Sequence, residues 1–446
     1  MGDLKELITN LSTFFDNQFD LIDSKTIERK RTVFSKHLYY TLIRMIQNKC
    51  SYESALIELK LLNVIDEECT HQALNTKILK GNYSKHFDGI NLSIINEHFD
   101  QSSNKIRAVD GSKITMSRSQ KKYGYQLVGK KRHCTGLLTT TYDVKNQIPL
   151  DYQISPDTGE IAMFHKQLIH MSSSLSSNKE LYIFDRGYHS EKNCKHLLSL
   201  NKDFIIRVKE NLTIIKDMKE LNTSDYIIQM DDHIVRVIRY KLPSKYGKIT
   251  KVNQKKFIIK RNDRNGTPLQ YKEIIKNSNN KIKIIMKCPP KDYYLITSLV
   301  DSEKYPIDLL IDMYHQRWSI EEHYKTVKRN LPSNKFHFST PESVQCELKS
   351  LQFISLMTRL FMKYLPQDPN KYKPNYTIIS EKLVNHIIPM LIFKELYNLE
   401  KIIKKFKVFS SSKVKCKPGR HFLRKNENIP PGYFLCKGDS ANSSIT

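Results

Sequence analysis

The fold is decided by a stretch of chain that begins with IRAVDGS at residues 106–112 and continues to LYIFDRGY at residues 181–188. Both segments open with short apolar runs that contain β-branched or aromatic residues, as buried strands do. Further strands are expected at 135–144, 148–154 and 204–208, with helices near 160–172 and 190–200. Three consecutive strands followed by alternating helices and strands predict an α/β protein whose mixed sheet begins within residues 105–208.

Downstream of this core the sequence pattern changes. Residues 209–298 are polar and β-rich, contain the turn signal Asn265-Gly266, and predict a β-rich insertion. Residues 299–365 are expected to complete the core with a long helix from Pro306 to about residue 329 and an apolar helix over 343–364. Residues 366–446 begin with a proline-marked linker and form a C-terminal basic region.

Upstream of the core, residues 1–104 have the pattern of a helical domain, which we expect to be an N-terminal DNA-binding domain. Phe34, Leu38 and Leu42 recur every four residues, and Ser51 is placed to cap a following helix. Two helices joined by a short turn at 48–50 fit a DNA-binding helix-turn-helix, and an ordinary helical hairpin fits the same pattern.

The charge of the chain favours a polyanionic partner. Its 73 Lys and Arg outnumber 46 Asp and Glu, which gives a formal net charge of +27. Nucleic acid is favoured over a membrane surface because basic residues that neutralise phosphates release condensed counterions. AT-biased codon usage would also enrich lysine. Ten basic residues and no acidic residue lie in 401–425, a candidate phosphate-binding block or a solvated tail.

Other classes of protein are excluded by what the sequence lacks. No apolar run approaches the ~20 residues of a membrane span, and the first residues do not resemble a secretion signal. The eight cysteines form no CxxC pair, so neither a zinc site nor a disulfide framework is indicated. We therefore expect an intracellular protein without a membrane partner.

Two aspartates are candidate site residues because they occupy similar places in the predicted sheet. Asp110 is expected to end one apolar strand before Gly111, and Asp185 to end another before Arg186. Carboxylates at strand ends project into the crevice where α/β proteins bind ligands. Each aspartate alone is more often a turn former or a helix cap, so the shared placement is the informative feature.

The predicted long helix carries a third group of candidate residues. Tyr314, Arg317, Glu321 and Lys328 are separated by 3, 4 and 7 positions, which places them on one helical face. A ladder of exposed ion pairs would have similar spacing. Glu322 is the alternative acid, but it lies about 100° further around a helix than Glu321.

Taken together, these motifs resemble the DDE transposases of bacterial insertion sequences, in particular the insertion sequence 4 family. Residues 106–112 resemble the first-Asp motif of that family, and residues 184–188 resemble the second. Residues 314–328 resemble its signature, Y-x2-R-x3-E-x6-K, around the catalytic glutamate. The third motif is the most specific, and the likeness covers nearly the whole chain.

The resemblance implies a ribonuclease H-like catalytic domain with Asp110 on the first strand, Asp185 on the fourth and Glu321 on a later helix. It also implies that these three residues bind two Mg²⁺ ions, for which Mn²⁺ can substitute. Electrostatics agree, since two carboxylates about 4 Å apart repel by roughly 4 kcal/mol at an effective dielectric constant of 20. Two metals about 3.5–4 Å apart suit in-line displacement at phosphorus.

The same resemblance assigns DNA contacts near the transposon end to Tyr314, Arg317 and Lys328. Arginine offers a planar, bidentate contact to phosphate, and lysine offers a mobile charge. Trp318 is the only tryptophan in the chain. Stacking on an unpaired base is one use for it, but packing in the core is favoured.

The resemblance therefore predicts a transposase that binds the terminal inverted repeats of its element, cleaves the DNA there and joins the 3′-OH ends to target DNA. A homodimer is expected in the DNA complex, in the nucleoid of a bacterial cytoplasm. The β insertion is similar to that of relatives that use a hairpin intermediate. Alternatives are a non-catalytic DNA-binding protein derived from a transposase and a host nuclease of the same fold.

Overall fold

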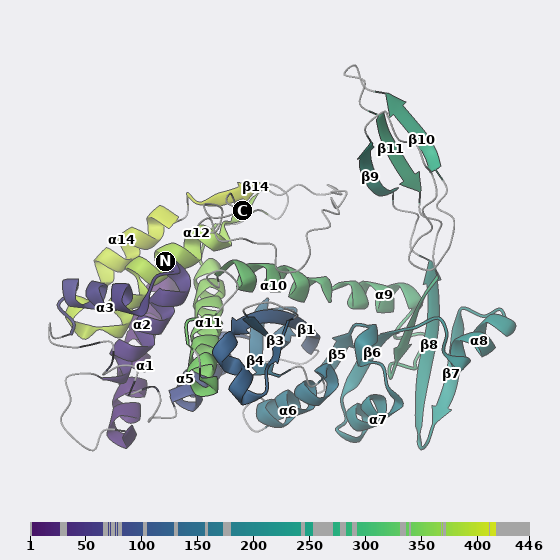
Figure 1. Cartoon of the computed structure of the whole chain (residues 1–446), viewed down its shortest axis with the longest axis horizontal. Helices are drawn as coiled ribbons and strands as arrows, with labels where there is room; N and C mark the ends of the chain where they lie inside the picture. The colour runs from purple at the N-terminus through teal and green to yellow at the C-terminus, as the bar shows by residue number, and fades with distance from the viewer. Residues whose placement is uncertain are drawn as a thin grey trace, which may run out of the picture. The chain divides into compact units, whose positions relative to one another are not determined.

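The computed structural model describes most of the chain (Figure 1). The described residues are 2–26, 34–65, 70, 72, 76, 78, 83–100, 105–128, 133–156, 159–172, 180–241, 246–252, 271–276, 282–287, 292–330, 336–338, 340–366, 368, 372–409 and 411–415. They belong to two compact units. The first contains the described residues between 2 and 206 and between 308 and 415, and the second contains those between 207 and 307.

The first unit is built on a mixed sheet. Its main strands are β1 (Lys105–Ser117), β3 (His133–Asp143), β4 (Ile148–Ser155), β5 (Glu180–Phe184) and β6 (Asp203–Val208). Their spatial order is β4-β3-β1-β5-β6. Strand β3 is antiparallel to β1 and β4, whereas β1, β5 and β6 run parallel. Counted among these five, the order is 3-2-1-4-5, which is the ribonuclease H-like arrangement that was predicted.

Two predicted helices, α6 (Glu160–Ser172) and α7 (Glu191–Ser199), follow β4 and β5. The buried side chain of Gln167 fastens α6 to the sheet, because its amide donates hydrogen bonds to the carbonyl oxygens of Thr139 and Asp151, at 3.0 and 3.1 Å. His165 on α6 also contacts Asn193 on α7 at 2.9 Å. These contacts fix where the first residue of α6 lies.

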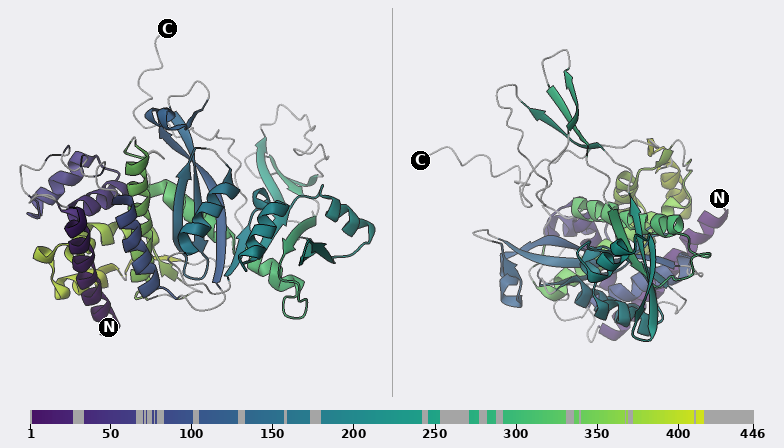
Figure 2. Two further views of the ribbon diagram at one scale, coloured as in Figure 1. Left: turned by 90° about the horizontal axis from the view of Figure 1, so that it is seen from below. Right: turned by 90° about the vertical axis from the view of Figure 1, so that its right-hand side faces the viewer.

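The hairpin of β1 and β3 is longer than predicted. Strand β1 continues for seven residues beyond Asp110, to Ser117, which pairs with His133. A short 3₁₀ helix, Arg118–Tyr123, and strand β2 (Gln126–Leu127) follow at the far end of the hairpin (Figure 2). The expectation that Asp110 ends its strand was therefore wrong, since pairing with β3 carries β1 onward after its parallel pairing with β5 stops.

The helix expected from 306 to about 329 is divided into α9 (Ile307–His315) and α10 (Trp318–Asn330). At the junction, the backbone N–H groups of Gln316 and Arg317 bond to carbonyl oxygens three residues earlier. This tight turn interrupts the 3.6-residue period, so the predicted single helical face is not continuous from Tyr314 to Lys328.

A helical layer completes the first unit. It contains α1 (Gly2–Thr26), α2 (Ser35–Asn48), α3 (Tyr52–Leu61), α5 (Tyr83–His98), α11 (Pro341–Met362), α12 (Tyr376–His386), α13 (Ile388–Ile392) and α14 (Leu399–Phe409), with the short strands β13 (Tyr372–Pro374) and β14 (Lys413–Lys415). Helix α11 is buried over most of its length and contacts α2, α5, α12 and β4. Helices α2 and α5 therefore pack on the same central helix as the mixed sheet.

The pair α2 and α3 fits the helical-hairpin interpretation better than a helix-turn-helix. Most of α2 is buried. The structure describes every residue of α3, and the exposed ones are Glu53, Ser54, Ile57 and Leu61. A recognition helix would be expected to present basic side chains to phosphate, and this surface offers an acid and two apolar residues instead.

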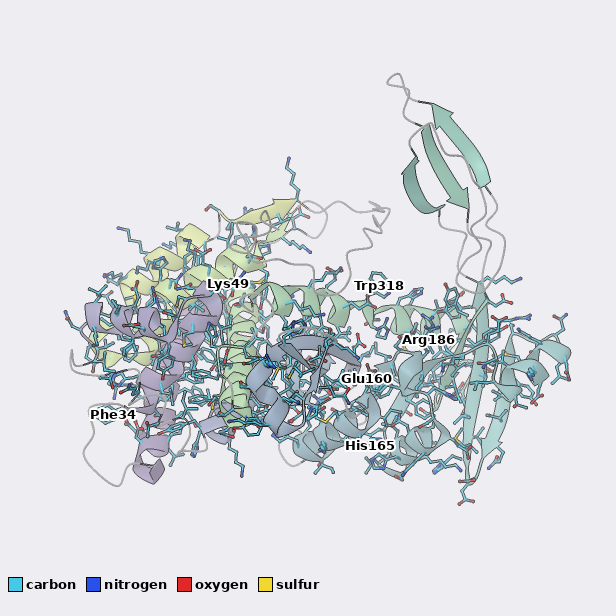
Figure 3. The ribbon with its side chains drawn as sticks, viewed as in Figure 1. Phe34, Lys49, Glu160, His165, Arg186 and Trp318 are labelled. Carbon is cyan, nitrogen blue, oxygen red and sulfur yellow. The ribbon has the colours of Figure 1, made fainter. Side chains whose placement is uncertain are left out.

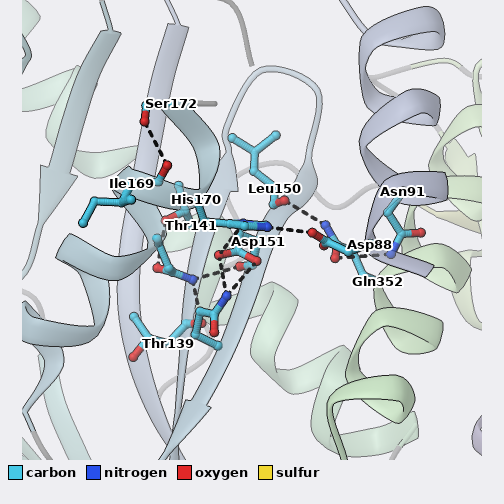
Figure 4. Close-up of polar contacts among 12 residues, drawn as sticks. Asp88, Asn91, Thr139, Thr141, Leu150, Asp151, Ile169, His170, Ser172 and Gln352 are labelled. Atoms are coloured by element: carbon cyan, nitrogen blue, oxygen red, sulfur yellow. Dashed lines mark hydrogen bonds and ion pairs between the residues drawn. The ribbon is translucent and has the colours of Figure 1, made fainter. Parts of the chain in front are cut away.

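A buried polar cluster joins the sheet to the helical layer (Figure 4). Lys349 of α11 contacts Asp151 of β4 at 2.9 Å and Asp88 of α5 at 2.5 Å. His170 of α6 lies 2.7 Å from Asp88 and 3.5 Å from Asp151. Burial alone would raise the pKa of Asp151, but Lys349 and His170 hold it well below its usual value. The hydrogen bonds to Asp151 and Asp88 raise the pKa of His170 to about 10.

The second unit contains the β-rich insertion. Helix α8 (Thr213–Glu220) precedes an antiparallel group of β7 (Asp225–Met230), β8 (His233–Lys241) and β12 (Asp292–Thr297), and a separate sheet contains β9 (Tyr246–Val252), β10 (Tyr271–Lys276) and β11 (Ile282–Lys287). Buried Arg236 fixes this unit internally through two hydrogen bonds to Asp225 at 2.8 and 2.6 Å.

Parts of the sequence predictions fall outside the described residues, among them the Asn265-Gly266 turn and the part of the basic block after residue 415. Among the described residues, none of the helices has the length and apolar character needed to cross a membrane.

Candidate active site

The parallel pairing of β1 with β5 brings the two aspartates together. Val109 is the register partner of Phe184, so Asp110 is the next residue of β1 and Asp185 is the residue directly after β5. Neighbouring strands lie about 4.8 Å apart, which places the two side chains in the same part of the sheet. Asp185 directly follows β5, as expected. Asp110 accepts a hydrogen bond from the backbone N–H of Gly111 at 3.0 Å.

Helix α10 lies against β1 near Asp110 because of Tyr324. Its hydroxyl donates a hydrogen bond to the carbonyl oxygen of Asp110 at 2.6 Å, and the carbonyl oxygen of Leu138 lies 3.2 Å from the same hydroxyl. Glu321 precedes Tyr324 by three residues and therefore lies on the same side of the helix. No sequence motif had indicated Tyr324. Its spacing from Glu321 was the only available signal, and an aromatic residue at that position is equally typical of core packing.

Arg317 stands between carboxylates of two different elements. Its guanidinium contacts Glu321 at 2.7 Å and approaches Asp110 at 3.8 Å, and it also interacts electrostatically with Asp185. The arginine side chain is only 8% exposed. A solvated ladder along one helix would not bury its arginine or direct it toward another strand. The geometry therefore favours a functional site over a ladder of exposed ion pairs.

The residues near this arginine differ in burial and in their partners. Tyr314 is 6% exposed, and the centroid of its ring lies 6.0 Å from the Arg317 guanidinium carbon. Lys328 is half-buried; burial lowers its pKa, and the charge of Asp110 acts in the opposite direction. Glu322, the alternative acid, instead pairs with Lys325 at the surface.

Trp318 does not pack in the core, contrary to the expectation. It begins α10 and is 47% exposed (Figure 3). The break between α9 and α10 explains the error, because the residue next to the buried Arg317 begins a new helix and faces outward. Its position beside the site leaves the base-stacking alternative open.

A fourth carboxylate, that of Glu160, also lies at this site, and the sequence analysis did not identify it (Figure 3). A Cβ atom built on Gly111 would lie 2.7 Å from Oε1 of Glu160, and one built on Gly187 would lie 3.4 Å from Oε2. Glu160 therefore lies beside the glycines that follow Asp110 and Asp185. The glycine shared by both aspartate motifs was the only trace of it in the sequence.

The electrostatics of the site fit a divalent cation. Burial is the main reason that the pKa of Asp110 rises to about 6; Arg317 and the Gly111 N–H oppose the rise, and Glu160 and Asp185 add to it. Arg317 acts on Asp110, Asp185 and Glu321, and Lys328 acts electrostatically on Asp110. Within the described residues, no three acidic, histidine or cysteine side chains already have the geometry of a metal site. The donors are nonetheless all carboxylate oxygens, which suit Mg²⁺ or Mn²⁺.

Comparison with known proteins supports this interpretation at the level of the family. A profile described as the transposase DDE domain matches residues 101–357, more than half of the 446-residue chain. No curated protein matches the chain. Among solved structures, it is similar to a piggyBac transposase synaptic complex with hairpin DNA, at 10% identity and a TM-score of 0.43, over 94% of this chain and 86% of that chain. A likeness this weak adds nothing to the strand order described above.

The narrower likeness to the insertion sequence 4 family stays a prediction. The matched residues include Asp110, Asp185 and Glu321, on the elements described above. On the strength of this match, the chain belongs to the transposase DDE domain family.

Proposed function

We propose that this transposase binds the terminal inverted repeats of an insertion sequence, cleaves DNA at those ends and joins the 3′-OH ends to target DNA. The observation that carries the proposal is the convergence of Asp110 and Glu321 on Arg317, with Asp185 in the same electrostatic environment. A homodimer would bring two ends together, in the nucleoid of a bacterial cytoplasm. A hairpin intermediate is the finer proposal, and the β-rich second unit supports it only by analogy.

In this proposal, Asp110, Asp185 and Glu321 hold two divalent cations. Bound cations of this kind activate the attacking oxygen and stabilise the leaving oxygen during displacement at phosphorus. Arg317 and Lys328 then contact DNA phosphates beside the metals. Tyr314 is assigned to the same DNA contact, and its burial beside Arg317 supports a role in orienting that guanidinium toward phosphate.

An assay with the DNA that flanks the reading frame tests this function. Duplexes carrying candidate terminal repeats, incubated with the full chain and Mg²⁺, should yield new 3′-OH ends and products joined to a second DNA. Cleavage without joining would favour the nuclease alternative. Binding without metal-dependent cleavage would favour the DNA-binding protein that has lost catalysis.

Arg317→Lys is predicted to slow cleavage of transposon ends by on the order of 100-fold, the effect expected of a misplacement of about 1 Å at the reacting centre. A lysine keeps the charge but loses the fork with which Arg317 reaches both Glu321 and Asp110. Single-turnover cleavage measures the rate, and thermal unfolding checks the fold. Lys325→Arg, at an exposed ion pair on the same helix, is the control. Equal rates for both variants and the parent would limit the contribution of Arg317 to local packing.

The hairpin that carries Asp110 is a further part of the proposed DNA path. Residues 111–142 contain seven Lys and Arg and no Asp or Glu. The structure describes four of these basic residues, Lys113, Arg118, Lys121 and Lys122, and all four are exposed. Ile114, Met116, Tyr125 and Cys134, in the far part of the hairpin, are buried. The exposed basic side chains therefore lie on the part of the hairpin that starts at Asp110 and extends away from the site.

Replacing Lys113, Lys121 and Lys122 together with Gln is predicted to weaken DNA binding and to reduce its salt dependence. If each contacts one phosphate, the slope of log affinity against log salt should become less steep by about 3. Binding to a transposon-end duplex at several salt concentrations measures the slope. Replacing the exposed lysines Lys5, Lys166 and Lys192 with Gln makes the same change of net charge elsewhere. A slope that changes equally in both variants would show a general effect of charge and no contact by the hairpin.

A further inference from the structure

We propose that Glu160 is a fourth acidic residue of the metal site and supplies a carboxylate oxygen to a divalent cation bound with Asp110 and Asp185. This inference rests on the proposed function, since it concerns the same cation site. It adds a residue that none of the three sequence motifs contains, from a helix that precedes the second aspartate.

The geometry of the two glycines carries the inference. A Cβ at Gly111 would lie 2.7 Å from Oε1 of Glu160 and 2.8 Å from its Cδ and Cγ, closer than real side chains approach. A Cβ at Gly187 would lie at a tight but ordinary contact distance of 3.4 Å from Oε2. The Glu160 carboxylate thus occupies space that a side chain at position 111 would otherwise fill. Because residue 111 is glycine, that space is available to the carboxylate.

The fold holds Glu160 in this place. It is the first residue of α6, and Gly159 before it has a φ of +95°, a conformation that favours glycine. Further along α6, Gln167 and His165 fasten the helix to the sheet and to α7. A carboxylate on a helix fixed at several points keeps a constant position relative to the two aspartates, as a metal ligand must.

The charge of Glu160 repels that of Asp110, which Asp185 also repels. An acidic residue in the first turn of a helix is favoured by the helix dipole, which would be a purely structural reason for Glu160. Glu191 has the same place on α7, but it lies at the surface and pairs with Lys195. Glu160 lies beside the glycines that follow Asp110 and Asp185 and repels Asp110, and a cation bound there would relieve that repulsion.

Glu160→Gln in the full chain tests the inference, with Glu191→Gln as the matched control. Binding of Mn²⁺ without DNA, measured by electron paramagnetic resonance, gives a readout that does not depend on activity. We expect Glu160→Gln to weaken Mn²⁺ binding at least tenfold and to raise the Mg²⁺ concentration for half-maximal cleavage by a similar factor. The metal-free thermal midpoint should stay the same or rise, because a repelling charge has been removed. Glu191→Gln should leave both metal measurements unchanged.

The outcome for Asp110→Asn separates this inference from the proposed function. If Asp110→Asn loses Mn²⁺ binding and Glu160→Gln keeps both the affinity and the Mg²⁺ dependence of the parent, the inference is overturned and the proposed site stands. If the parent binds no Mn²⁺ and cleaves no DNA, the proposed function fails and the inference fails with it.

Gly111→Ala provides a second test that leaves the carboxylate in the chain. The added Cβ would force Glu160 to move, so metal binding should weaken as it does in Glu160→Gln. In the double variant Gly111→Ala with Glu160→Ala the crowding is removed, and we expect the thermal midpoint to recover while metal binding stays weak. Recovery of metal binding in the double variant would show that the backbone around Asp110 matters and the Glu160 carboxylate does not.

Discussion

Glu321→Gln is expected to reduce metal-dependent cleavage of transposon ends by on the order of 1,000-fold or more, equivalent to about 4 kcal/mol of transition-state stabilisation. The change keeps the size of the side chain and removes the charge that faces Arg317 at 2.7 Å. A neutral amide is a poor ligand for Mg²⁺ where a carboxylate is needed, so the site would bind its cations weakly. Single-turnover cleavage at saturating Mg²⁺ measures the loss.

Glu322→Gln is the matched control for this prediction. Glu322 is adjacent in sequence, but its carboxylate pairs with Lys325 at the surface. Its replacement should leave the cleavage rate within about twofold of the parent, since exposed ion pairs contribute about 0–1 kcal/mol. Asp110→Asn and Asp185→Asn should behave like Glu321→Gln. A variant of any of the three that cleaves at the parental rate would remove that residue from the proposed metal site.

Lys349→Met should lower the free energy of unfolding by about 3–5 kcal/mol, the cost of removing one partner from a buried ion pair. Lys349 is almost fully buried, and its ammonium lies between Asp151 and Asp88. Methionine fills a similar volume but leaves two carboxylates without their main cation. His170 would still contact both of them.

Urea-induced unfolding of the full chain measures this effect. Lys382→Met removes a lysine from an ion pair with Glu381 at the surface, and should change the free energy of unfolding by less than about 1 kcal/mol. If Lys349→Met were as stable as Lys382→Met, the cluster would contribute little to stability.

Local patterns predicted the sheet well because its strands are buried on both sides. The runs at 106–110, 148–154, 181–185 and 204–208 all lie in or next to observed strands, and Asp185 follows β5 as expected. The position of Asp110 within β1 was not predictable from its own apolar run. The extension of β1 depends on pairing with β3, whose partner residues lie more than fifteen positions away.

The errors at the site have similar causes. The tight turn between α9 and α10 leaves the spacing of polar residues intact, so the sequence could not reveal that Trp318 would face outward. A glutamate at the start of a helix is common, and nothing local to Glu160 indicates that it lies beside Gly111. Contacts of this kind depend on how β4 and α6 return across the sheet. They become visible only in three dimensions.

The buried cluster around Lys349 also limits where the protein can be truncated without exposing its core. Asp88, one of its two carboxylates, belongs to α5, which precedes the first strand of the sheet. A fragment starting at residue 105 would retain Asp110, Asp185 and Glu321 and still expose the face of α11 that α2 and α5 cover. Such a fragment is expected to aggregate when expressed. If such a fragment did not prefer transposon ends, misfolding would be a sufficient explanation. The residues that recognise transposon ends are therefore better identified by surface substitutions in the intact chain.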